Sequence, residues 1–502
     1  MLANISSAIV LGVDGHPVAV EVHIGAGLPG LTIVGLPDAS CREARDRVRA
    51  AVLAARVSWP VRKITVNLAP SSTRKMGSGL DLAMAVGVLV ASEHLTPEQV
   101  AGFGFIGELG LDGSIRPVPG VIPLVDALAC ETVVVPVESA ADAALVVGSR
   151  ARPVANLAEL IAALKGAPWP DHPAPPPPEP DVTSLDLADV RGQTAVRKAI
   201  ELAAAGAHHL LMVGPPGSGK TMLANRLPGV LPELDRSAAM EASRIHSAAG
   251  RSLRGDLIRR PPMRSPHHTA TMVALVGGGT DAMRPGEISL AHGGVLFLDE
   301  LAEFSPTVLD ALRQPLEEGV IRVSRARFNA KLPARVLLVA AMNPCPCGEA
   351  GRPGACRCPD GLVTRYRRRL SGPLLDRFDL RIDVQRPDVD KLLGGDPGET
   401  SAAVAARVVR ARGRAQERGV RANAELRGPD LDRLAPLSPE ATSLLSDRLQ
   451  AGRLSARGLA RVRRVALTVA DLAGHAGPVR AADVATALLL RSDITLGIGV
   501  AA

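Results

Sequence analysis

The stretch HLLMVGPPGSGKT, residues 209–221, decides the fold class of this 502-residue chain. Its first part is an apolar run that predicts a buried strand, and the helix-like segment MLANRL follows at 222–227. Glycines between a strand and a helix let backbone N–H groups turn inward around phosphate groups. We therefore expect an α/β fold that binds a nucleotide through the loop residues Gly214, Pro215, Pro216, Gly217, Ser218, Gly219, Lys220 and Thr221.

Two acidic residues follow a second predicted strand, in the segment GVLFLDE at 294–300. Carboxylates at the end of a buried strand are costly unless they have a task such as metal binding. Asp299 is expected to hold Mg2+ through water, and Glu300 to orient or deprotonate the attacking water. Lys220 would reach the outer phosphates and the Thr221 hydroxyl would bind Mg2+. The pattern predicts hydrolysis of Mg-ATP.

A third strand is predicted within VIRVSRARFNAKLPARVLLVAAMN, residues 320–343, which reads as a hairpin followed by a buried strand. The strand ends at Asn343, where a polar side chain lies beside the expected γ-phosphate. Asn343 either positions water or caps the strand end. Upstream, Ser305 and its following proline predict a helix start, Pro315 a kink and Gly319 a helix end.

The composition, 46% hydrophobic and 22% charged, indicates ordinary globular protein, and the length favours two or three domains. No apolar stretch reaches the roughly 18 to 20 residues of a membrane-spanning helix, and no signal-peptide pattern is visible, so we expect a cytoplasmic protein without a membrane partner. The net charge is +7. Six arginines near residue 410 form either a solvated helix face or a surface for a polyanion: Arg407, Arg410, Arg412, Arg414, Arg418 and Arg421.

Composition shifts divide the chain into predicted units. Residues 1–165 alternate strand-like and helix-like segments, for example ITVNL at 64–68 and GLDLAMAVGVLVASEHL at 79–95, and Asp112-Gly113 predicts a hairpin turn. Proline-rich residues 166–183 predict a linker. The nucleotide motifs lie in 184–387, and a helical unit is expected at 388–502.

The cysteines fall into two groups. Four lie in one Gly- and Pro-rich segment as two C-x-C pairs, a spacing that favours a structural Zn2+ site but also fits reduced thiols or a redox pair. The four are Cys345, Cys347, Cys356 and Cys358. Cys41 and Cys130 stand alone and are expected to be buried apolar residues.

Five motifs in order, GPPGSGKT, GGVLFLDE, AAMNPCPCG, SGPLLDRFDL and LSARGLARVRRVALTVADL, resemble those of the magnesium-chelatase-like AAA+ ATPases, specifically the bacterial ComM family, also called YifB. The resemblance covers nearly the whole chain. It implies an N-terminal Lon-protease-like (ribosomal S5-like) α/β domain, an AAA+ α/β core and a helical C-terminal lid. It also implies a ring-shaped homo-oligomer, typically a hexamer, that uses ATP and Mg2+.

The same resemblance assigns roles to residues outside the loop. Arg377, in LLDRFDL, would reach into the neighbouring subunit's site and stabilise charge on the γ-phosphate; the alternative is a surface arginine paired with Asp376 or Asp379. Arg457 corresponds to the lid arginine that contacts phosphates, with Arg461 as its competitor.

Two segments resemble the insertions that line the ring's pore in this clade. They are PHHTATMVALVGGG, residues 266–279, and the hairpin that carries Arg325, Arg327 and Lys331. These basic residues either grip phosphate or belong to an ordinary exposed hairpin.

The N-terminal domain resembles a protease that lacks its chemistry. In TRKMGSGLDLAMA, residues 73–85, Gly79 stands where the resemblance would place a nucleophilic serine, and Ile122 stands where it would place the partner lysine. A nucleophile without an activating base is inert, and no lysine is placed to serve Ser78. We expect no proteolysis; a structural role, or nucleic-acid binding through Arg74 and Lys75, stays open.

The resemblance implies a hexameric DNA translocase that acts on single-stranded or branched DNA and promotes branch migration in homologous recombination or natural transformation. Recombination proteins are candidate partners. The alternatives are a magnesium-chelatase-type motor subunit and a protein-remodelling ATPase. Fold and nucleotide site alone do not decide among them.

Overall fold

The computed structural model describes residues 2–172, 185–279, 283–325, 328–350, 354–386 and 398–491, together with residues 390 and 394. Within these residues a sheet of five parallel strands carries the nucleotide motifs, in the order β11-β14-β17-β10-β18. Strands β10, β14 and β17 are buried along their whole length, as expected for a parallel sheet covered on both faces. The strands are β10 (Leu210–Val213), β11 (Met263–Arg264), β14 (Val295–Leu298), β17 (Leu337–Met342) and β18 (Leu380–Asp383).

The helix predicted after Glu300 forms with the expected boundaries. The Ser305 hydroxyl accepts the Val308 N–H at 3.3 Å, and Gly319 ends the segment with φ +68°. The predicted kink appears as a break at Leu312, between α12 (Pro306–Ala311) and α13 (Arg313–Glu318). The other helices of this unit are α7 (Thr194–Gly206), α8 (Lys220–Ala224), α9 (Arg236–Ala248), α10 (Met272–Val276), α11 (Glu287–Leu290), α14 (Asp360–Arg368) and α15 (Gly372–Leu375).

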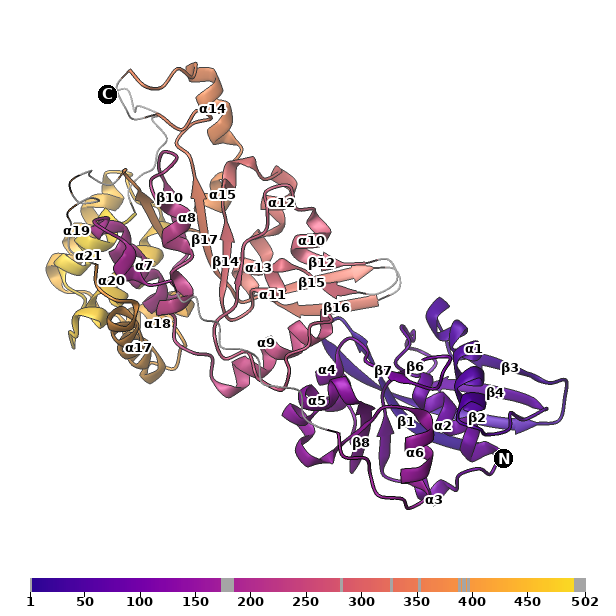
Figure 1. Cartoon of the computed structure of the whole chain (residues 1–502). Helices are drawn as coiled ribbons and strands as arrows, with labels where there is room; N and C mark the ends of the chain where they lie inside the picture. Colours follow the sequence, from indigo (N-terminus) through magenta and orange to yellow (C-terminus); the bar gives the residue numbers. More distant parts are fainter. Residues whose placement is uncertain are drawn as a thin grey trace.

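A helical unit follows the sheet and packs on α7, on the left in Figure 1. One hydrophobic cluster runs from the sheet through α7 into these helices, so the two parts share a core. The predicted boundaries at 165, 183 and 387 stay predictions. The helices are α17 (Ser401–Glu417), α18 (Gly428–Leu434), α19 (Pro439–Gln450), α20 (Ala456–Ala473) and α21 (Ala481–Leu489).

Both interpretations of the arginine cluster are wrong for four of its six members. Arg412 donates to the Ala204 carbonyl at 2.7 Å, and burial lowers its pKa to about 10. Arg407 pairs with Glu201 at 2.5 Å and also with Glu399. The other two of these four arginines bind partners within the C-terminal helical unit. Arg414 donates to the Asp471 and His475 carbonyls, and Arg418 pairs with Asp471. These guanidinium groups join helices to one another, because α17 packs on α7 and α20.

The N-terminal unit is a second α/β unit with its own sheet. Within residues 2–172, seven strands form one mixed sheet in the order β3-β4-β2-β1-β5-β8-β9. The strand predicted at 64–68 is present, and the helix predicted at 79–95 forms over the shorter range Asp81–Ala91, in which every residue is buried. The elements are β1 (Leu2–Leu11), β2 (Asp14–Gly25), β3 (Gly30–Val34), β4 (Lys63–Ala69), β5 (Phe103–Phe105), β8 (Thr132–Pro136), β9 (Ala151–Val154), α1 (Ala39–Ala54), α2 (Asp81–Ala91), α3 (Pro97–Val100), α4 (Val121–Asp126), α5 (Ala140–Val147) and α6 (Leu157–Leu164).

Several local predictions in this unit are resolved by the structure. The hairpin forms between β6 (Glu108–Leu109) and β7 (Ile115–Arg116), although only Gly113 of the predicted pair takes positive φ, +85°. Cys41 is buried as expected, but Cys130 is only half-buried. Lys75 is fully buried and its ammonium group donates to the Pro70 carbonyl, so the nucleic-acid role considered for Lys75 is wrong.

The N-terminal unit is docked on the nucleotide unit through α4 and α9, which lie side by side in Figure 1. The Gly120 N–H donates to the Ser247 carbonyl at 2.8 Å, and the Ile122 N–H donates to the Ser247 hydroxyl at 3.2 Å. The Asp142 carboxylate accepts the N–H groups of Leu253 and Gly255, each at 2.9 Å. Polar backbone contacts of this kind fix one orientation of the two units.

A two-stranded hairpin, β15 (Val320–Arg325) with β16 (Phe328–Pro333), projects from the core beside the N-terminal unit. Lys331 is exposed on it, whereas Arg327 and the side chain of Arg325 lie outside the described residues. A shorter pair joins β12 (Gly277–Gly278) to β13 (Arg284–Pro285). The part of the predicted linker that the structure describes, 166–172, forms no helix or strand; the rest lies outside the described residues.

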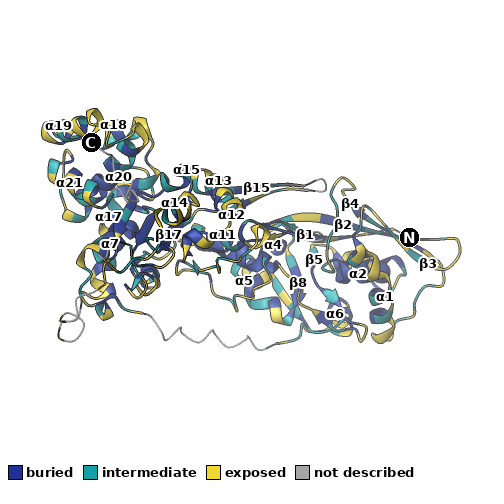
Figure 2. Cartoon of the chain, turned by 90° about the horizontal axis from the view of Figure 1, so that it is seen from above, coloured by how far each residue is buried: buried dark blue, intermediate teal, exposed yellow. Residues whose placement is uncertain are grey.

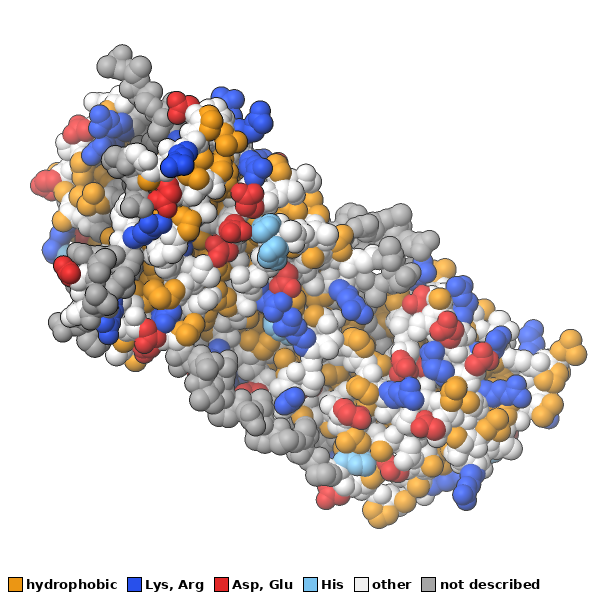
Figure 3. All heavy atoms as spheres, turned by 45° about the horizontal axis from the view of Figure 1, so that its top comes forward, with side chains coloured by type: hydrophobic (Ala, Val, Ile, Leu, Met, Phe, Trp, Pro, Cys, Tyr) orange, Lys and Arg blue, Asp and Glu red, His pale blue; other side chains and the backbone are white. Residues whose placement is uncertain are grey.

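Burial follows the two sheets, as the dark central strands of Figure 2 show. On the face drawn in Figure 3, basic and acidic side chains are interspersed. Among the described residues, no helix has the length and apolar character needed to cross a bilayer.

Candidate nucleotide-binding site

The loop after β10 has the backbone shape that its glycines predict. Gly217 and Gly219 take positive φ, +74° and +86°. A Cβ on Gly214 would lie 2.1 Å from the Val384 carbonyl, so only glycine fits there. A Cβ on Gly217 would meet no atom within 4 Å, so the inside of the loop is open. The loop therefore provides an uncovered backbone cradle at the carboxyl end of the sheet.

Lys220 lies across this cradle. Its ammonium group donates to the carbonyls of Gly214, at 2.7 Å, and Pro215, at 2.9 Å, and lies 3.4 Å from the Asn343 amide oxygen. Burial lowers the pKa of Lys220, although Asp299 opposes the effect. An ammonium group held only by neutral oxygens is a ready partner for phosphate, because an anion would restore its ordinary pKa.

Thr221 and Asp299 contact each other beside the loop. The Thr221 hydroxyl donates to an Asp299 carboxylate oxygen at 2.6 Å. A hydroxyl and a carboxylate are hard oxygen ligands, which Mg2+ prefers, and the remaining positions of its octahedron are filled by water and substrate phosphates. The Thr221 hydroxyl and the Asp299 carboxylate therefore fit Mg2+.

Glu300 contacts Asp299 and His268. It has positive φ, +50°, which is a strained backbone conformation for a residue with a side chain. Its N–H donates to Asp299 at 2.9 Å, and one carboxylate oxygen lies 3.1 Å from His268 Nδ1. The His268 ring stands edge-on to Phe304, with 6.5 Å between the ring centroids. His268 was not among the predicted site residues. The pair of adjacent histidines within residues 266–279 is the signal in the sequence that could have indicated it.

Five predicted residues therefore meet at one edge of the sheet. Because β10, β14 and β17 are parallel, their carboxyl ends place the loop, the two acids and Asn343 together. The five are Lys220, Thr221, Asp299, Glu300 and Asn343.

The two predicted arginines lie elsewhere. Arg377 is nearly buried; it pairs with Glu317 and donates to the Pro373 carbonyl at 2.6 Å. The alternative of a surface arginine paired with Asp376 or Asp379 is wrong, because Arg377 is buried and pairs with Glu317, whereas Asp379 pairs with Arg461 and Asp376 with Arg381. Arg457 lies exposed on the first turn of α20 and makes no polar contact with any described residue.

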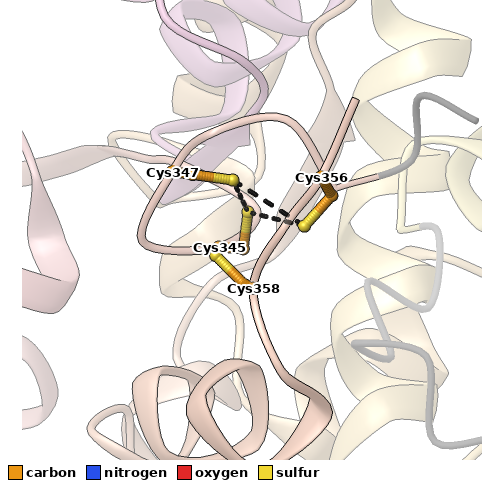
Figure 4. Close-up of side chains that lie close together, drawn as sticks. All are labelled: Cys345, Cys347, Cys356 and Cys358. Carbon is orange, nitrogen blue, oxygen red and sulfur yellow. Dashed lines mark hydrogen bonds between the residues drawn. The ribbon is translucent and has the colours of Figure 1, made fainter. Parts of the chain in front are cut away.

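The four clustered cysteines converge, as Figure 4 shows. Their sulfur atoms all lie within 4.8 Å of one another, and three of the separations are 3.3, 3.7 and 3.8 Å. A disulfide needs about 2.05 Å, whereas sulfurs placed tetrahedrally about 2.3 Å from zinc are about 3.8 Å apart. The backbone N–H of Glu349 lowers the pKa of Cys347 to about 6. The cluster has the geometry of a tetrathiolate metal site.

Comparison with known proteins agrees with this architecture. Residues 186–392 match the family described as "Magnesium chelatase, subunit ChlI", residues 398–491 its C-terminal family, and residues 20–139 "Subunit ChlI of Mg-chelatase". An uncharacterized protein of Mycobacterium tuberculosis is 47% identical over 95% of this chain and 96% of its own length. YifB of Escherichia coli is 42% identical over 94% of this chain and 93% of its own length. Competence protein ComM of Haemophilus influenzae is 42% identical over 94% of each.

The chain belongs to the ComM/YifB family of magnesium-chelatase-like proteins. This family assignment confirms the predicted α/β AAA+ fold and gives the chain an AAA+ ATPase role that uses ATP and Mg2+. In this ComM/YifB family member, the loop 214–221 and the acids at 299 and 300 remain the predicted residues for that role.

Proposed function

We propose that the chain is an ATP-driven DNA translocase of the cytoplasm. As a hexameric ring it moves single-stranded or branched DNA and promotes branch migration in homologous recombination or natural transformation. The observation that carries this proposal is the near-full-length match to a competence protein by a chain that retains the ATPase constellation. ATP and Mg2+ are its cofactors, and a structural Zn2+ on the four thiols is a third.

The chemistry of ATP hydrolysis follows from the five residues that meet at the sheet edge. Lys220 leaves the loop carbonyls for the outer phosphates, and the backbone amides of the loop bind their oxygens. Thr221, and Asp299 through water, would hold Mg2+, which would supply positive charge against the negative charge of the phosphates. Glu300 takes the proton of the attacking water, and Asn343 orients that water beside Lys220.

A ring explains why Arg377 and Arg457 lie apart from these five residues. Arg377 contacts α13 and α15 and none of these five residues, and we assign it to the site of a neighbouring subunit. Arg457 is free to meet phosphate because no described residue holds it. This arrangement makes hydrolysis depend on assembly.

DNA would contact the segments that face the ring's pore. Lys331 is exposed on the β15–β16 hairpin, and α10 follows His268 in the other segment. On the face drawn in Figure 3 charges of both signs alternate, so a broad DNA-binding surface is not offered there. Phosphate contacts by a few basic side chains suffice for binding without sequence preference.

The test is steady-state ATP hydrolysis by the full chain, with and without single-stranded and four-way-junction DNA, over a series of salt concentrations. Glu300→Gln should bind ATP but lose at least about a hundredfold in turnover, because general-base catalysis is removed. Glu303→Gln, a nearby acid that pairs with Arg369, is the matched control and should keep activity. DNA should stimulate the wild type, and salt should reduce this stimulation.

If no DNA changes the rate of ATP hydrolysis, the proposal of a DNA translocase is wrong, and a protein partner should be sought instead. Full activity in Glu300→Gln would instead remove the proposed base. Mass measurement under native conditions, with ATP present, checks the hexamer independently.

A further inference from the structure

The loop that carries the four thiols forms one wall of the nucleotide cradle. It begins directly after Asn343, whose amide oxygen lies 3.4 Å from Lys220 Nζ. Gly348 is buried, and a Cβ at this position would lie 2.4 Å from the Pro216 ring. The backbone at Gly348 therefore rests directly on the phosphate-binding loop.

A side chain from beyond β18 ties the same two loops together. Arg386 donates to Glu349 at 2.7 Å and to the Pro216 carbonyl at 3.3 Å. Glu349 belongs to the thiol loop, two residues after Cys347. A displacement of the thiol loop would therefore move both contacts of Pro216, the packing of Gly348 and the hydrogen bond of Arg386.

Regular secondary structure does not hold the shape of the thiol loop. Its described parts, 344–350 and 354–358, contain no helix or strand, and Cys345 is the only one of their side chains that joins the buried core. The Cys345 sulfur accepts the Ala350 N–H at 3.3 Å, an outer-shell contact typical of metal-bound thiolates. Closed four-ligand zinc sites stabilise loops of this kind.

We propose that Cys345, Cys347, Cys356 and Cys358 bind one structural Zn2+, and that the zinc-bound loop holds Pro216 and Asn343 in position for ATP. The inference rests on the proposed nucleotide site. Zinc acts here through geometry, since it keeps Gly348 and Glu349 against the phosphate-binding loop. ATP affinity therefore depends on metal that never touches the nucleotide.

The experiment measures zinc content and ATP affinity in the same full-length samples. Zinc is counted by elemental mass spectrometry, and affinity is measured with a fluorescent ATP analogue in the presence of Mg2+. The wild type should hold one zinc per chain. The double variant Cys347→Ser with Cys358→Ser should hold none and bind the analogue about tenfold more weakly. Cys130→Ser, which changes a distant half-buried thiol, is the control.

A second variant separates the effect of the contact between Gly348 and Pro216 from the effect of losing zinc. Gly348→Ala should retain zinc, because it changes no ligand, yet weaken ATP binding, since its Cβ meets Pro216 and its φ is +82°. Stripping zinc from the wild type with a chelator should weaken ATP binding, and adding Zn2+ back should restore it. This reversal does not depend on the folding of any variant.

The outcomes are distinguishable. A wild-type chain that neither contains nor takes up zinc overturns the inference, as does a disulfide in the freshly purified cytosolic protein. Zinc that can be removed without any change in ATP affinity overturns the positioning role. A zinc-loaded wild type that binds no ATP overturns the proposed nucleotide site itself.

Discussion

His268 Nδ1 lies 3.1 Å from a carboxylate oxygen of Glu300. The candidate general base is therefore bound by the segment that leads, a few residues later, into α10. Movement of that segment would release the carboxylate toward the phosphate site. A single contact thus connects the candidate DNA-facing segment with the chemical step.

Removal of this contact should raise hydrolysis in the absence of DNA. We expect His268→Ala to increase basal turnover by up to about tenfold, the equivalent of one hydrogen bond to a charged group, and to reduce the further stimulation by DNA. The control is His16→Ala, which removes an exposed histidine of β2 in the N-terminal unit. Steady-state assays with and without single-stranded DNA compare the three chains. Lower basal turnover in His268→Ala would contradict the restraint and make His268 a participant in catalysis.

Arg377 should act on a neighbouring subunit. Arg377→Ala should bind ATP but lose about a thousandfold in turnover, as when an arginine finger is removed. Mixing Arg377→Ala with Lys220→Ala chains should restore part of the activity, because some intact loops then face an intact arginine. Arg433→Ala, an exposed arginine of α18, is the control. A mixture as inactive as its components would refute action between subunits.

Arg457 and Arg461 should separate into functional and structural roles. Burial alone would raise the pKa of Asp379, but the His208 ring, 3.7 Å from its carboxylate, and the charge of Arg461 hold it well below the ordinary value. Arg461→Ala leaves that buried carboxylate short of a partner and should cost about 3 kcal/mol of stability, seen as a lower thermal midpoint. Arg457→Ala should leave the midpoint unchanged and weaken ATP turnover. Equal thermal losses in both variants would contradict this division.

Glu241 should make stability depend on pH in the acid range. Its hydrogen bond with His292, with help from Arg335, lowers its pKa from 4.5 to about 2. A depressed carboxyl pKa stabilises the fold above the unfolded value and loses this contribution as pH falls toward 2. Glu241→Gln should therefore unfold at a lower temperature at pH 7, and the difference should shrink between pH 4.5 and pH 3. Glu417→Gln, an exposed acid, should match the wild type throughout.

The strands and loop of the nucleotide site were predictable because their signals are local. A continuous apolar run before Gly214, and another before Asp299, each describes a strand buried on both faces. The convergence of Asn343 on Lys220 follows once the strands are parallel. These features need no knowledge of distant contacts.

The errors concern side chains whose partners lie far along the chain. Arg377 finds Glu317, 60 residues away, and Arg412 finds the carbonyl of Ala204, 208 residues away. Lys75 is a different case, because its partner, the Pro70 carbonyl, is close in the sequence, and the burial of Lys75 depends on how the surrounding N-terminal unit packs. Charge predicts neither exposure nor partner, since both depend on which helix packs on which.

The contact between Ile122 and Ser247 limits which residue can occupy position 122. Ile122 stands where the resemblance to a protease would place a lysine, yet it is fully buried and its N–H donates to α9. A lysine there would bring an ammonium group into the joint between the two units, at a cost of several kcal/mol. A lysine at position 122 would therefore weaken the attachment of the N-terminal unit to the nucleotide unit, so the residue required for peptidase chemistry and the contact with α9 exclude each other.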